Sequence, residues 1–208
     1  VFSSKWLSRN VLPGQFLNLQ IENAHGLLLR RPFSYYRVTG NRIEILYEIL
    51  GRGTALLAEK RAGHRLKALG PLGKSFSPNV SGKKQVLVAG GVGVPPLVFL
   101  AETVRAMHAS PLLLLIGCGS KSEVLPKREL AQIKGEISYA TDDGSYGIKG
   151  FVTDGLKQIL NKKEKVDKVI AIGPVVMMKS VAALTKEYKI PTVVSLNPIM
   201  IDATGMCG

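Results

Sequence analysis

The spacing of apolar and polar residues changes partway along the chain, near residue 80. From Pro13 to about Phe76, short apolar stretches alternate with turn residues at intervals of about 8 to 12 positions, a pattern typical of an antiparallel barrel or sandwich. Strands are expected at residues 15–21, 42–49 and 65–69, and a short helix at 54–60. Thr54 can cap this helix, because its hydroxyl can accept a backbone N–H of the first turn. The first half is thus predicted to be all-β apart from one helical segment.

The second half alternates apolar runs of strand length with longer helical stretches. The expected strands lie at 86–89, 112–117, 137–140, 168–172 and 192–196, and the expected helices at 96–109, 124–133, 153–160 and 175–188. Strands that alternate with helices predict a parallel sheet, and their near-continuous apolar character indicates that helices cover both faces. We therefore expect a β plus α/β chain, in which an antiparallel β-barrel (1–80) precedes a doubly wound parallel-sheet domain (81–196).

Composition and charge narrow the function classes. The 46% apolar content is sufficient for hydrophobic cores, and no apolar run approaches the roughly 18 residues of a membrane-spanning helix. The two cysteines, Cys118 and Cys207, form no complete CxxC pair, which favours a reducing, cytoplasmic setting over a secreted, disulfide-linked protein. Residues 1–84 carry 14 Lys/Arg against 4 Asp/Glu and account for most of the net charge of +13. A basic half favours an anionic partner, such as a phosphate-bearing cofactor or an acidic protein, whereas the scattered placement of the charges does not favour nucleic acid.

Two segments of the first half are suited to holding phosphate. The first is Arg30–Ser34, which is expected between two strands. Its Arg31 has a planar guanidinium that suits a phosphate, and its Pro32 fixes the backbone. Ser34 could touch a ring held by that phosphate, although an Arg-Pro turn at a strand edge is the alternative if this motif stands alone. Gly51–Thr54 follows where a strand is expected to lead into a helix, the geometry that grips a phosphate through backbone N–H groups.

Four glycine-bearing loops of the second half each follow an expected strand. They are Gly90–Pro96, Gly117–Ser120, Thr141–Gly144 and Gly173–Pro174. Any one of them could be a structural turn, but the carboxyl ends of parallel strands share one edge of a sheet, so together they predict a nucleotide-binding crevice there. Asp142 and Asp143 are both candidates to hydrogen-bond a ribose hydroxyl, and acidic residues at this position disfavour a 2′-phosphate.

Taken in order, these motifs resemble the ferredoxin-NADP reductase superfamily and, within it, the branch of dihydroorotate dehydrogenase electron-transfer subunits. Pro13–Phe16, Arg31–Ser34 and Gly51–Thr54 are similar to the family's first-strand, flavin and flavin-pyrophosphate motifs. Gly90–Leu97 resembles its nucleotide loop, and Thr141–Gly147 with Lys149–Asp154 is a long match to this branch. The resemblance implies that the first domain (1–80) binds FAD and the second (81–196) binds NAD(H).

The resemblance also implies which residues contact each cofactor. Those expected at FAD are Arg31, Pro32, Phe33, Ser34, Tyr47, Glu48, Ile49, Gly53 and Thr54, with Ser34 catalytic beside the reactive flavin nitrogen. Those expected at the nicotinamide nucleotide are Gly90, Gly91, Val92, Gly93, Gly117, Thr141, Asp142, Asp143, Gly144, Gly173 and Pro174. Much of the superfamily has Cys before this Gly-Pro pair, and Ile172 at that position argues against a thiol role near the nicotinamide.

The last residues, 197–208, are expected to begin an iron-sulfur segment. By resemblance to the small subunits of NADH-dependent ferredoxin:NADP oxidoreductase, Asp202 and Cys207 would be the first two ligands of a [2Fe-2S] cluster, with Asp where Cys is usual. Two further cysteines would follow, so the ligand set within these 208 residues is incomplete. The alternative is that Cys207 is a small apolar residue with no ligand role.

Together these expectations describe an oxidoreductase subunit. It would transfer a hydride between NAD(H) and FAD and pass electrons through the cluster to a second, glutamate-synthase-like flavoprotein subunit or to ferredoxin. The first alternative is a dihydroorotate dehydrogenase electron-transfer subunit, whose partner would be the dihydroorotate dehydrogenase catalytic subunit. The second alternative is a non-catalytic nucleotide-binding module.

Overall fold

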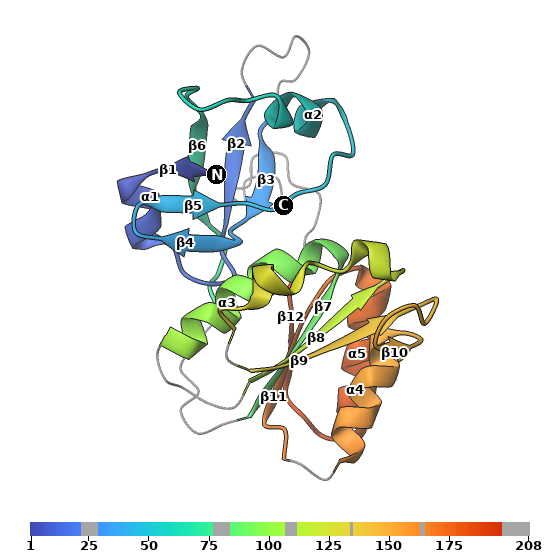
Figure 1. Cartoon of the computed structure of the whole chain (residues 1–208). Helices are drawn as coiled ribbons and strands as arrows, with labels where there is room; N and C mark the ends of the chain where they lie inside the picture. Colours follow the sequence, from blue (N-terminus) through green and yellow to red (C-terminus); the bar gives the residue numbers. More distant parts are fainter. Residues whose placement is uncertain (22–28, 77–83, 107–111, 134, 163–164, 197–208) are drawn as a thin grey trace. The chain divides into compact units, whose positions relative to one another are not determined.

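The chain forms two compact units (Figure 1). The computed structural model describes residues 1–21, 29–76, 84–106, 112–133, 135–162 and 165–196. The first unit covers Val1–Phe76 and the second ends at Leu196. None of the helices within the described ranges is long and apolar enough to cross a membrane.

The first unit contains two three-stranded antiparallel sheets. One has the order β1 (Phe2–Ser3), β5 (Arg42–Glu44), β4 (Arg37–Thr39), and the other has the order β3 (Arg31–Ser34), β2 (Phe16–Gln20), β6 (Lys67–Leu72). Two short helices accompany them, α1 (Lys5–Asn10) and α2 (Arg52–Ala58). The side chains of Leu17, Leu19, Tyr35 and Ile43 are fully buried and form the centre of this antiparallel unit.

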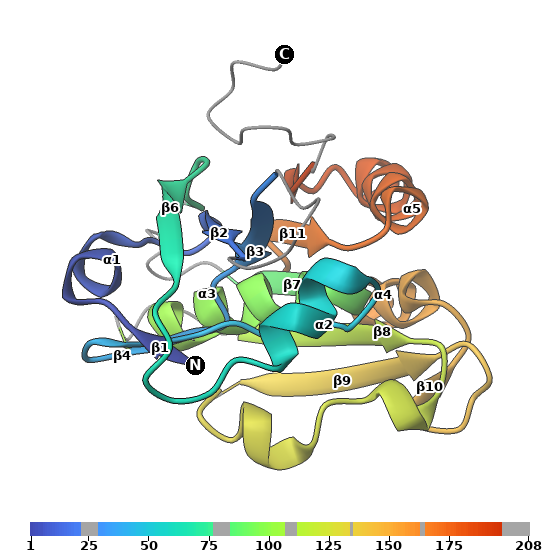
Figure 2. The ribbon, with the colours of Figure 1, turned by 90° about the horizontal axis from the view of Figure 1, so that it is seen from above.

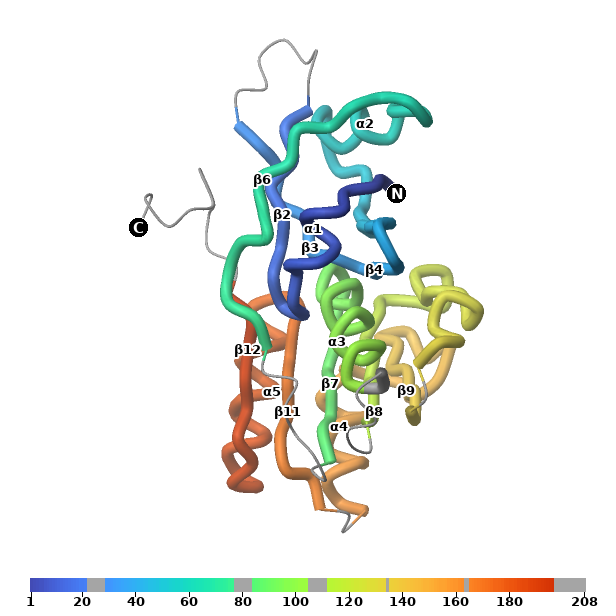
Figure 3. The backbone as a smooth tube through the Cα atoms, turned by 90° about the vertical axis from the view of Figure 1, so that its left-hand side faces the viewer, coloured from blue at the N-terminus to red at the C-terminus, as the bar shows by residue number. Residues whose placement is uncertain are grey.

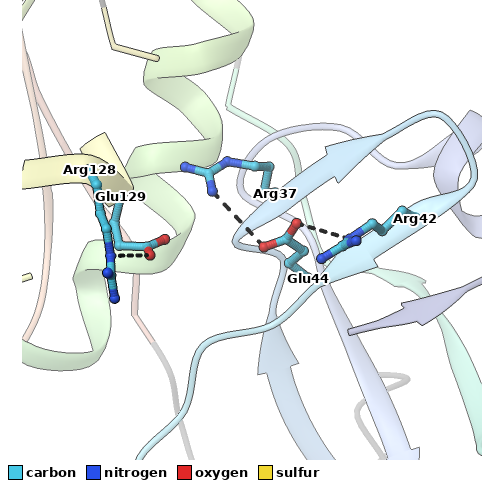
Figure 4. A network of polar contacts seen from close by, with 5 residues as sticks. All are labelled: Arg37, Arg42, Glu44, Arg128 and Glu129. Carbon is cyan, nitrogen blue, oxygen red and sulfur yellow. Dashed lines mark ion pairs between the residues drawn. The ribbon is translucent and has the colours of Figure 1, made fainter. Parts of the chain in front are cut away.

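A carboxylate of β5 pairs with arginines of β4 and β5. Arg37 lies directly opposite Glu44 in the register of the two strands, and its Nη1 is 4.0 Å from Glu44 Oε2 (Figure 4). Arg42 Nε lies 3.3 Å from Glu44 Oε1, so one carboxylate is shared by two guanidinium groups. The Arg37 guanidinium also lies 4.8 Å from the centre of the Tyr36 ring. Of these contacts, the Arg37–Glu44 pair crosses from β4 to β5, whereas the other two lie within one stretch of chain.

Three expectations for the first unit need correction. The strand expected at 42–49 ends at Glu44, because its partners β1 and β4 provide no hydrogen-bonding positions beyond that residue. The segment expected between two strands, Arg31–Ser34, is itself strand β3. The helix expected from Thr54 begins at Arg52, and its N-cap is Gly51.

The second unit is built on a six-stranded sheet in which every neighbouring pair is parallel. Its order is β10 (Ile148–Lys149), β9 (Glu136–Thr141), β8 (Leu112–Cys118), β7 (Gln85–Gly90), β11 (Lys168–Ile172), β12 (Thr192–Val194). Figure 2 shows β9, β8, β7 and β11 side by side. From β7 the chain adds strands outward to β10 and then crosses to β11 on the other side of β7. This is a doubly wound sheet, which confirms the expected fold class.

Helices pack on both faces of this sheet. Val86 and Val88 of β7 belong to a buried cluster that includes Leu156 of α4 (Val152–Asn161) and Val181 of α5 (Val175–Glu187). Successive strand residues point to opposite faces, so Leu87 and Ala89 face the other way, where α3 (Val94–Ala106) contacts β7 and β8. The tube in Figure 3 follows the chain from β7 into α3.

One helix of the second unit was wrongly expected. Residues 124–133 do not form a helix, and two short 3₁₀ turns, Lys121–Glu123 and Lys127–Leu130, stand in this region. Pro126 lies between them with an extended ψ of 139°. Proline lacks the N–H that an α-helix requires and disfavours the helical conformation of the residue before it, which explains the break. The two-residue strand β10 was not expected, and residues 107–109 of the helix expected at 96–109 lie outside the described residues.

Candidate functional site

The Arg31–Ser34 segment lies along the edge strand β3 of the first unit. Pro32 is paired with Asn18 of β2, and among the described strands β3 has no neighbour on its other side. An edge position tolerates proline, because a missing N–H costs no second ladder bond there. Successive side chains of β3 point to opposite faces of the sheet. Phe33 is 8% exposed, whereas Ser34, paired with Phe16, is half-buried.

The two segments expected to hold phosphate meet in space. A Cβ placed on Gly53 would lie 3.3 Å from Arg31 Nε and 3.5 Å from Ile21 Cδ1, so the Arg31 side chain passes directly against Gly53. Arg31 Nη1 donates to the carbonyl oxygen of Leu29 at 2.7 Å, which anchors the guanidinium. Gly53 belongs to the first turn of α2, whose N–H groups have no partners within the helix. An arginine and a helix start therefore converge on one place.

Thr54 shapes the turn before α2. Its Oγ1 accepts the backbone N–H groups of Leu50 at 3.1 Å and Gly51 at 3.2 Å, and it donates to the Gly51 carbonyl at 3.0 Å. The hydroxyl is thus engaged within its own loop, as the N3 residue of the helix rather than as the expected N-cap. The geometry gives Thr54 a role in holding the turn.

Tyr47 packs against the β3 motif. Its ring lies 5.5 Å from that of Phe33, edge to face at 63°, and burial raises the pKa of its hydroxyl. The two residues that follow, Glu48 and Ile49, are exposed, and Ile49 presents 60% of its surface. The Arg31–Ser34 and Tyr47–Ile49 segments, 13 or more positions apart in the sequence, therefore lie side by side at Phe33 and Tyr47.

A pocket of about 440 Å³ opens at the carboxyl edge of the parallel sheet in the second unit. It is lined by Gly90, Gly91, Gly117, Cys118, Gly119, Glu123, Asp142, Phe151, Val152, Thr153, Pro174, Val176, Met177 and Ser180. All four glycine-bearing loops contribute to it. The loops after β7 and β11 do so at the point where the strand order reverses, which is where open α/β sheets bind ligands.

Glycines bring the backbone close together beneath this pocket. A Cβ on Gly93 would overlap the carbonyl group of Ile172 in β11, so the turn after β7 packs directly on the neighbouring strand. Gly91 has φ of +51° and open space where its Cβ would be, which leaves its backbone accessible from the pocket. The Met177 side chain covers Gly90 and Gly173, with its Sδ 2.5 Å and 3.0 Å from their respective Cβ positions.

The structure separates the two candidate aspartates. Asp142 lines the pocket. Asp143 does not, and its Oδ1 accepts the Ser145 N–H at 2.9 Å and the Ser145 hydroxyl at 2.6 Å, which lowers the pKa of its carboxyl group. Thr141 is fully buried, and its hydroxyl accepts from Tyr146 N and donates to Tyr146 O. Asp143 and Thr141 therefore hold the loop that presents Asp142.

Comparison with known proteins decides the family. No protein-family model matches the chain. It is 32% identical over 208 residues to the dihydroorotate dehydrogenase B (NAD(+)) electron transfer subunit of Desulforamulus reducens, covering 99% of this chain and 79% of the relative. The chain belongs to the family of dihydroorotate dehydrogenase electron-transfer subunits.

Further relatives agree with this family. The electron transfer subunit of the same enzyme from Geobacillus thermodenitrificans is 38% identical over 200 residues, which span 94% of this chain and 75% of the relative. A solved structure of an NADH-dependent reduced ferredoxin-NADP oxidoreductase matches with a TM-score of 0.84 and 30% identity over 99% of this chain and 73% of that chain. Like its relatives, this electron-transfer subunit is an oxidoreductase.

Several pocket residues of this electron-transfer subunit were missed from the sequence. Glu123 Oε2 accepts the Gly119 N–H at 3.0 Å and brings a second carboxylate to the pocket beside Asp142. Burial, together with the negative charges of Glu123 and Asp142, raises the pKa of the Cys118 thiol. Phe151 offers a ring that is 67% exposed. The sequence did hold a signal for Cys118, which lies within the glycine-bearing loop 117–120, and for Phe151, which lies within the family match Lys149–Asp154. It held none that linked Glu123 to the pocket.

The remaining expected residues are placed as follows. Gly144 and Val92 lie near the pocket loops without lining the cavity; Val92 is 66% exposed, and a Cβ on Gly144 would meet Lys149. The expected cluster ligands Asp202 and Cys207 lie outside the described residues. Among the residues that are described, no group of three or more His, Cys, Asp or Glu side chains is arranged to hold a metal ion.

Proposed function

We propose that this subunit transfers a hydride between NAD(H), bound in the pocket of the second unit, and FAD, bound by the first unit, and passes the electrons to a partner. The observation that carries the proposal is the pocket at the reversal point of the parallel sheet, to which all four glycine-bearing loops contribute. The relatives support the nucleotide, because their names specify NAD(+) and NADH.

The residues of the first unit fit FAD. Arg31 beside Gly53 would bind the pyrophosphate, since guanidinium forks and helix N-termini both favour phosphate, and a side chain at Gly53 would fill the space against Arg31. The Phe33–Tyr47 pair would support the flavin ring, and Ser34, next in the strand, would hydrogen-bond its reactive edge. When bound, FAD supplies hydride acceptance and one-electron release, while the protein contributes position and electrostatics.

The residues of the second unit fit an adenine dinucleotide without a 2′-phosphate. Gly91 would allow the pyrophosphate to approach the start of α3. Asp142, supported by Asp143 and Ser145, would accept the ribose hydroxyls. Glu123 adds a second negative charge to the same pocket, which would repel the extra phosphate of NADP(H).

The route by which electrons would leave FAD is inferred from the resemblance to the family. A [2Fe-2S] cluster with Asp202 and Cys207 as its first ligands would carry single electrons to a glutamate-synthase-like flavoprotein subunit or to ferredoxin. The dihydroorotate dehydrogenase catalytic subunit is the second candidate partner, and the names of the 32–38% identical relatives favour it. Co-purification of the native complex distinguishes the two, because only one partner oxidises dihydroorotate.

The decisive experiment is spectroscopic. The full-length protein should show flavin absorption bands that bleach when NADH is added without oxygen, and its iron content should be about two per flavin if the cluster is present. Flavin bands without iron would remove the cluster from the proposal while leaving hydride transfer intact. A colourless protein that binds NADH but cannot reduce an artificial acceptor would identify a non-catalytic nucleotide-binding module.

A further inference from the structure

Two consecutive methionines in the first turn of α5 lie in different surroundings. Met177 lines the nucleotide pocket and is half-buried, whereas Met178 is 4% exposed and belongs to the buried cluster that contains Val181. Consecutive side chains of an α-helix point in directions about 100° apart around its axis, which explains the difference. The same thioether group is thus present twice in one turn, once at an open pocket and once in the core.

The Met177 thioether fills space that two glycines leave free. Its Sδ lies 2.5 Å from the position of a Cβ on Gly90, and its Cε lies 2.6 Å from the position of a Cβ on Gly173. Gly90 ends β7 and Gly173 follows β11, so the side chain lies where the strand order reverses. On this side the sulfur lies against backbone and has no room for a further atom. An oxygen added to the sulfur therefore has to point toward the pocket or push the side chain off both glycines.

The pocket also determines which sulfur atom an oxidant attacks first. Among the described residues, the sulfur-bearing side chains that line it are Met177 and Cys118. Burial and the charges of Glu123 and Asp142 raise the pKa of the Cys118 thiol, and the thiolate is the form that reacts readily with peroxides. A thioether has no proton to lose, so neighbouring carboxylates do not suppress its reaction in this way. We therefore expect Met177 to react before Cys118.

Oxidation of a thioether needs only hydrogen peroxide from outside the protein. A lone pair of the sulfur attacks one peroxide oxygen, the O–O bond breaks and an S–O bond forms. The hydroxide that leaves takes the proton of the transferred hydroxyl and departs as water, so sulfur is oxidised by two electrons and the peroxide is reduced. The product, methionine sulfoxide, is polar, and methionine sulfoxide reductases convert it back to methionine.

The added oxygen would lie beside the position proposed for the nucleotide. Gly90 adjoins Gly91, where the pyrophosphate is proposed to approach the backbone, and both glycines line the pocket together with Met177. The partly negative sulfoxide oxygen repels phosphate oxygens, and water has to be removed from it when a ligand enters. Oxidation should therefore weaken dinucleotide binding.

We propose that Met177 is a site of reversible oxidation by hydrogen peroxide, and that its sulfoxide lowers the affinity of the second unit for the nicotinamide nucleotide. The selective oxidation rests on the surroundings of Met177 and Met178 alone. The loss of affinity also rests on the proposed function, because it requires the nucleotide to occupy this pocket.

The test follows oxidation and nucleotide binding in the same samples. Full-length protein with its flavin is treated with graded amounts of hydrogen peroxide, and catalase then removes the excess. Mass spectrometry with peptide fragmentation measures oxidation at Met177, Met178 and Cys118, and isothermal titration calorimetry measures the dissociation constant of NAD+. Met177→Leu removes the thioether of the pocket at nearly constant volume, and Met178→Leu is the matched variant in the core. Each treated variant is compared with its own untreated sample.

The proposal predicts a distinct result for each sample. Met177 should be oxidised faster than Met178 and Cys118, and NAD+ present during the treatment should slow its oxidation. The dissociation constant of NAD+ should rise about fivefold or more as Met177 sulfoxide accumulates, and methionine sulfoxide reductase should restore it. Peroxide should not change the dissociation constant of Met177→Leu, whereas Met178→Leu should respond as the unaltered protein does.

The proposal is wrong if Met178 is oxidised as fast as Met177, or if complete oxidation of Met177 leaves the dissociation constant unchanged. It is also wrong if the loss of affinity follows oxidation of Cys118 and is reversed by a thiol reductant instead of the reductase. Untreated protein that binds no NAD+ would refute the proposed function and with it the loss of affinity. In that case the rates of oxidation at Met177 and Met178 would still decide whether Met177 is the modification site.

Discussion

Replacing Gly93 by Ala tests the packing on which the nucleotide pocket depends. The added Cβ would overlap the Ile172 carbonyl and lie 2.9 Å from the Gly173 N, so backbone rather than a flexible side chain must move. Overpacking typically costs about 1–3 kcal/mol, and a backbone clash belongs at the upper end, near 3 kcal/mol. For a chain of this size that corresponds to a midpoint for thermal unfolding lower by about 6–12 °C. Differential scanning calorimetry measures the shift, and the NADH KM should rise as the β7 turn is displaced from β11.

Gly91→Ala is the matched control, two residues away in the same turn. Its Cβ meets nothing within 4 Å, and only its φ of +51° opposes the substitution, at a cost of about 1–2 kcal/mol. Gly93→Ala should therefore be the more destabilising of the two by about 1–2 kcal/mol. Equal losses, or a larger loss for Gly91→Ala, would refute the argument that the β7 turn packs directly on β11.

Three further predictions concern the chemistry of the nucleotide pocket. Asp142→Asn should raise the ratio of kcat/KM for NADPH to kcat/KM for NADH by about fivefold, because placing a phosphate near an exposed carboxylate costs roughly 1 kcal/mol. Asp143→Asn should leave that ratio unchanged. Equal effects of the two variants would contradict the assignment of Asp142, rather than Asp143, to the ribose. Alkylation of Cys118 should become fast only above the pH range of an ordinary thiol, because burial and the charges of Glu123 and Asp142 raise its pKa. Glu123→Gln should shift the pH profile of the alkylation rate to lower pH, and NAD+ should protect Cys118 from alkylation. A rate that does not depend on residue 123 would contradict the contribution of the Glu123 charge to this pKa. Since hydrogen bonds from Ser145 lower the pKa of Asp143, their stabilisation is present above the unfolded pKa and is lost as pH falls below about 4 through the folded value. Ser145→Ala removes the hydroxyl donor and keeps the backbone N–H donor, so it should partly flatten that part of the curve of unfolding free energy against pH. An unchanged curve would show that the hydroxyl hydrogen bond contributes nothing.

Local patterns were sufficient for most of the second unit. The apolar runs at 86–89, 112–117 and 168–172 became β7, β8 and β11, because a strand buried on both faces must be apolar along its whole length. The same reasoning placed four loops at one edge, and the pocket draws on all four. The prediction of a helix at 124–133 was wrong, because Pro126 breaks the helix that the apolar spacing alone would favour.

The first unit was harder to predict, since short antiparallel strands depend on partners that lie far apart in the sequence. The run 42–49 has the right composition for a long strand, but only residues 42–44 have partners in β1 and β4. Likewise, the sequence predicted that Arg31–Ser34 and Gly51–Thr54 each bind phosphate, but the contact between Arg31 and Gly53 depends on how β3 and α2 pack.

By itself the sequence determined the main strands and most helices of the second unit, the change from an antiparallel to a parallel unit, and the residue types that could hold phosphates and ribose. The tertiary structure alone decided which of those residues act together. It assigned Asp142 to the pocket and Asp143 to its loop, added Glu123 and Phe151 to the lining, and placed the Met177 side chain against Gly90 and Gly173. The physical reason is that propensity and periodicity act over a few neighbouring residues, whereas a binding site is made by side chains that only the packing of distant elements brings together.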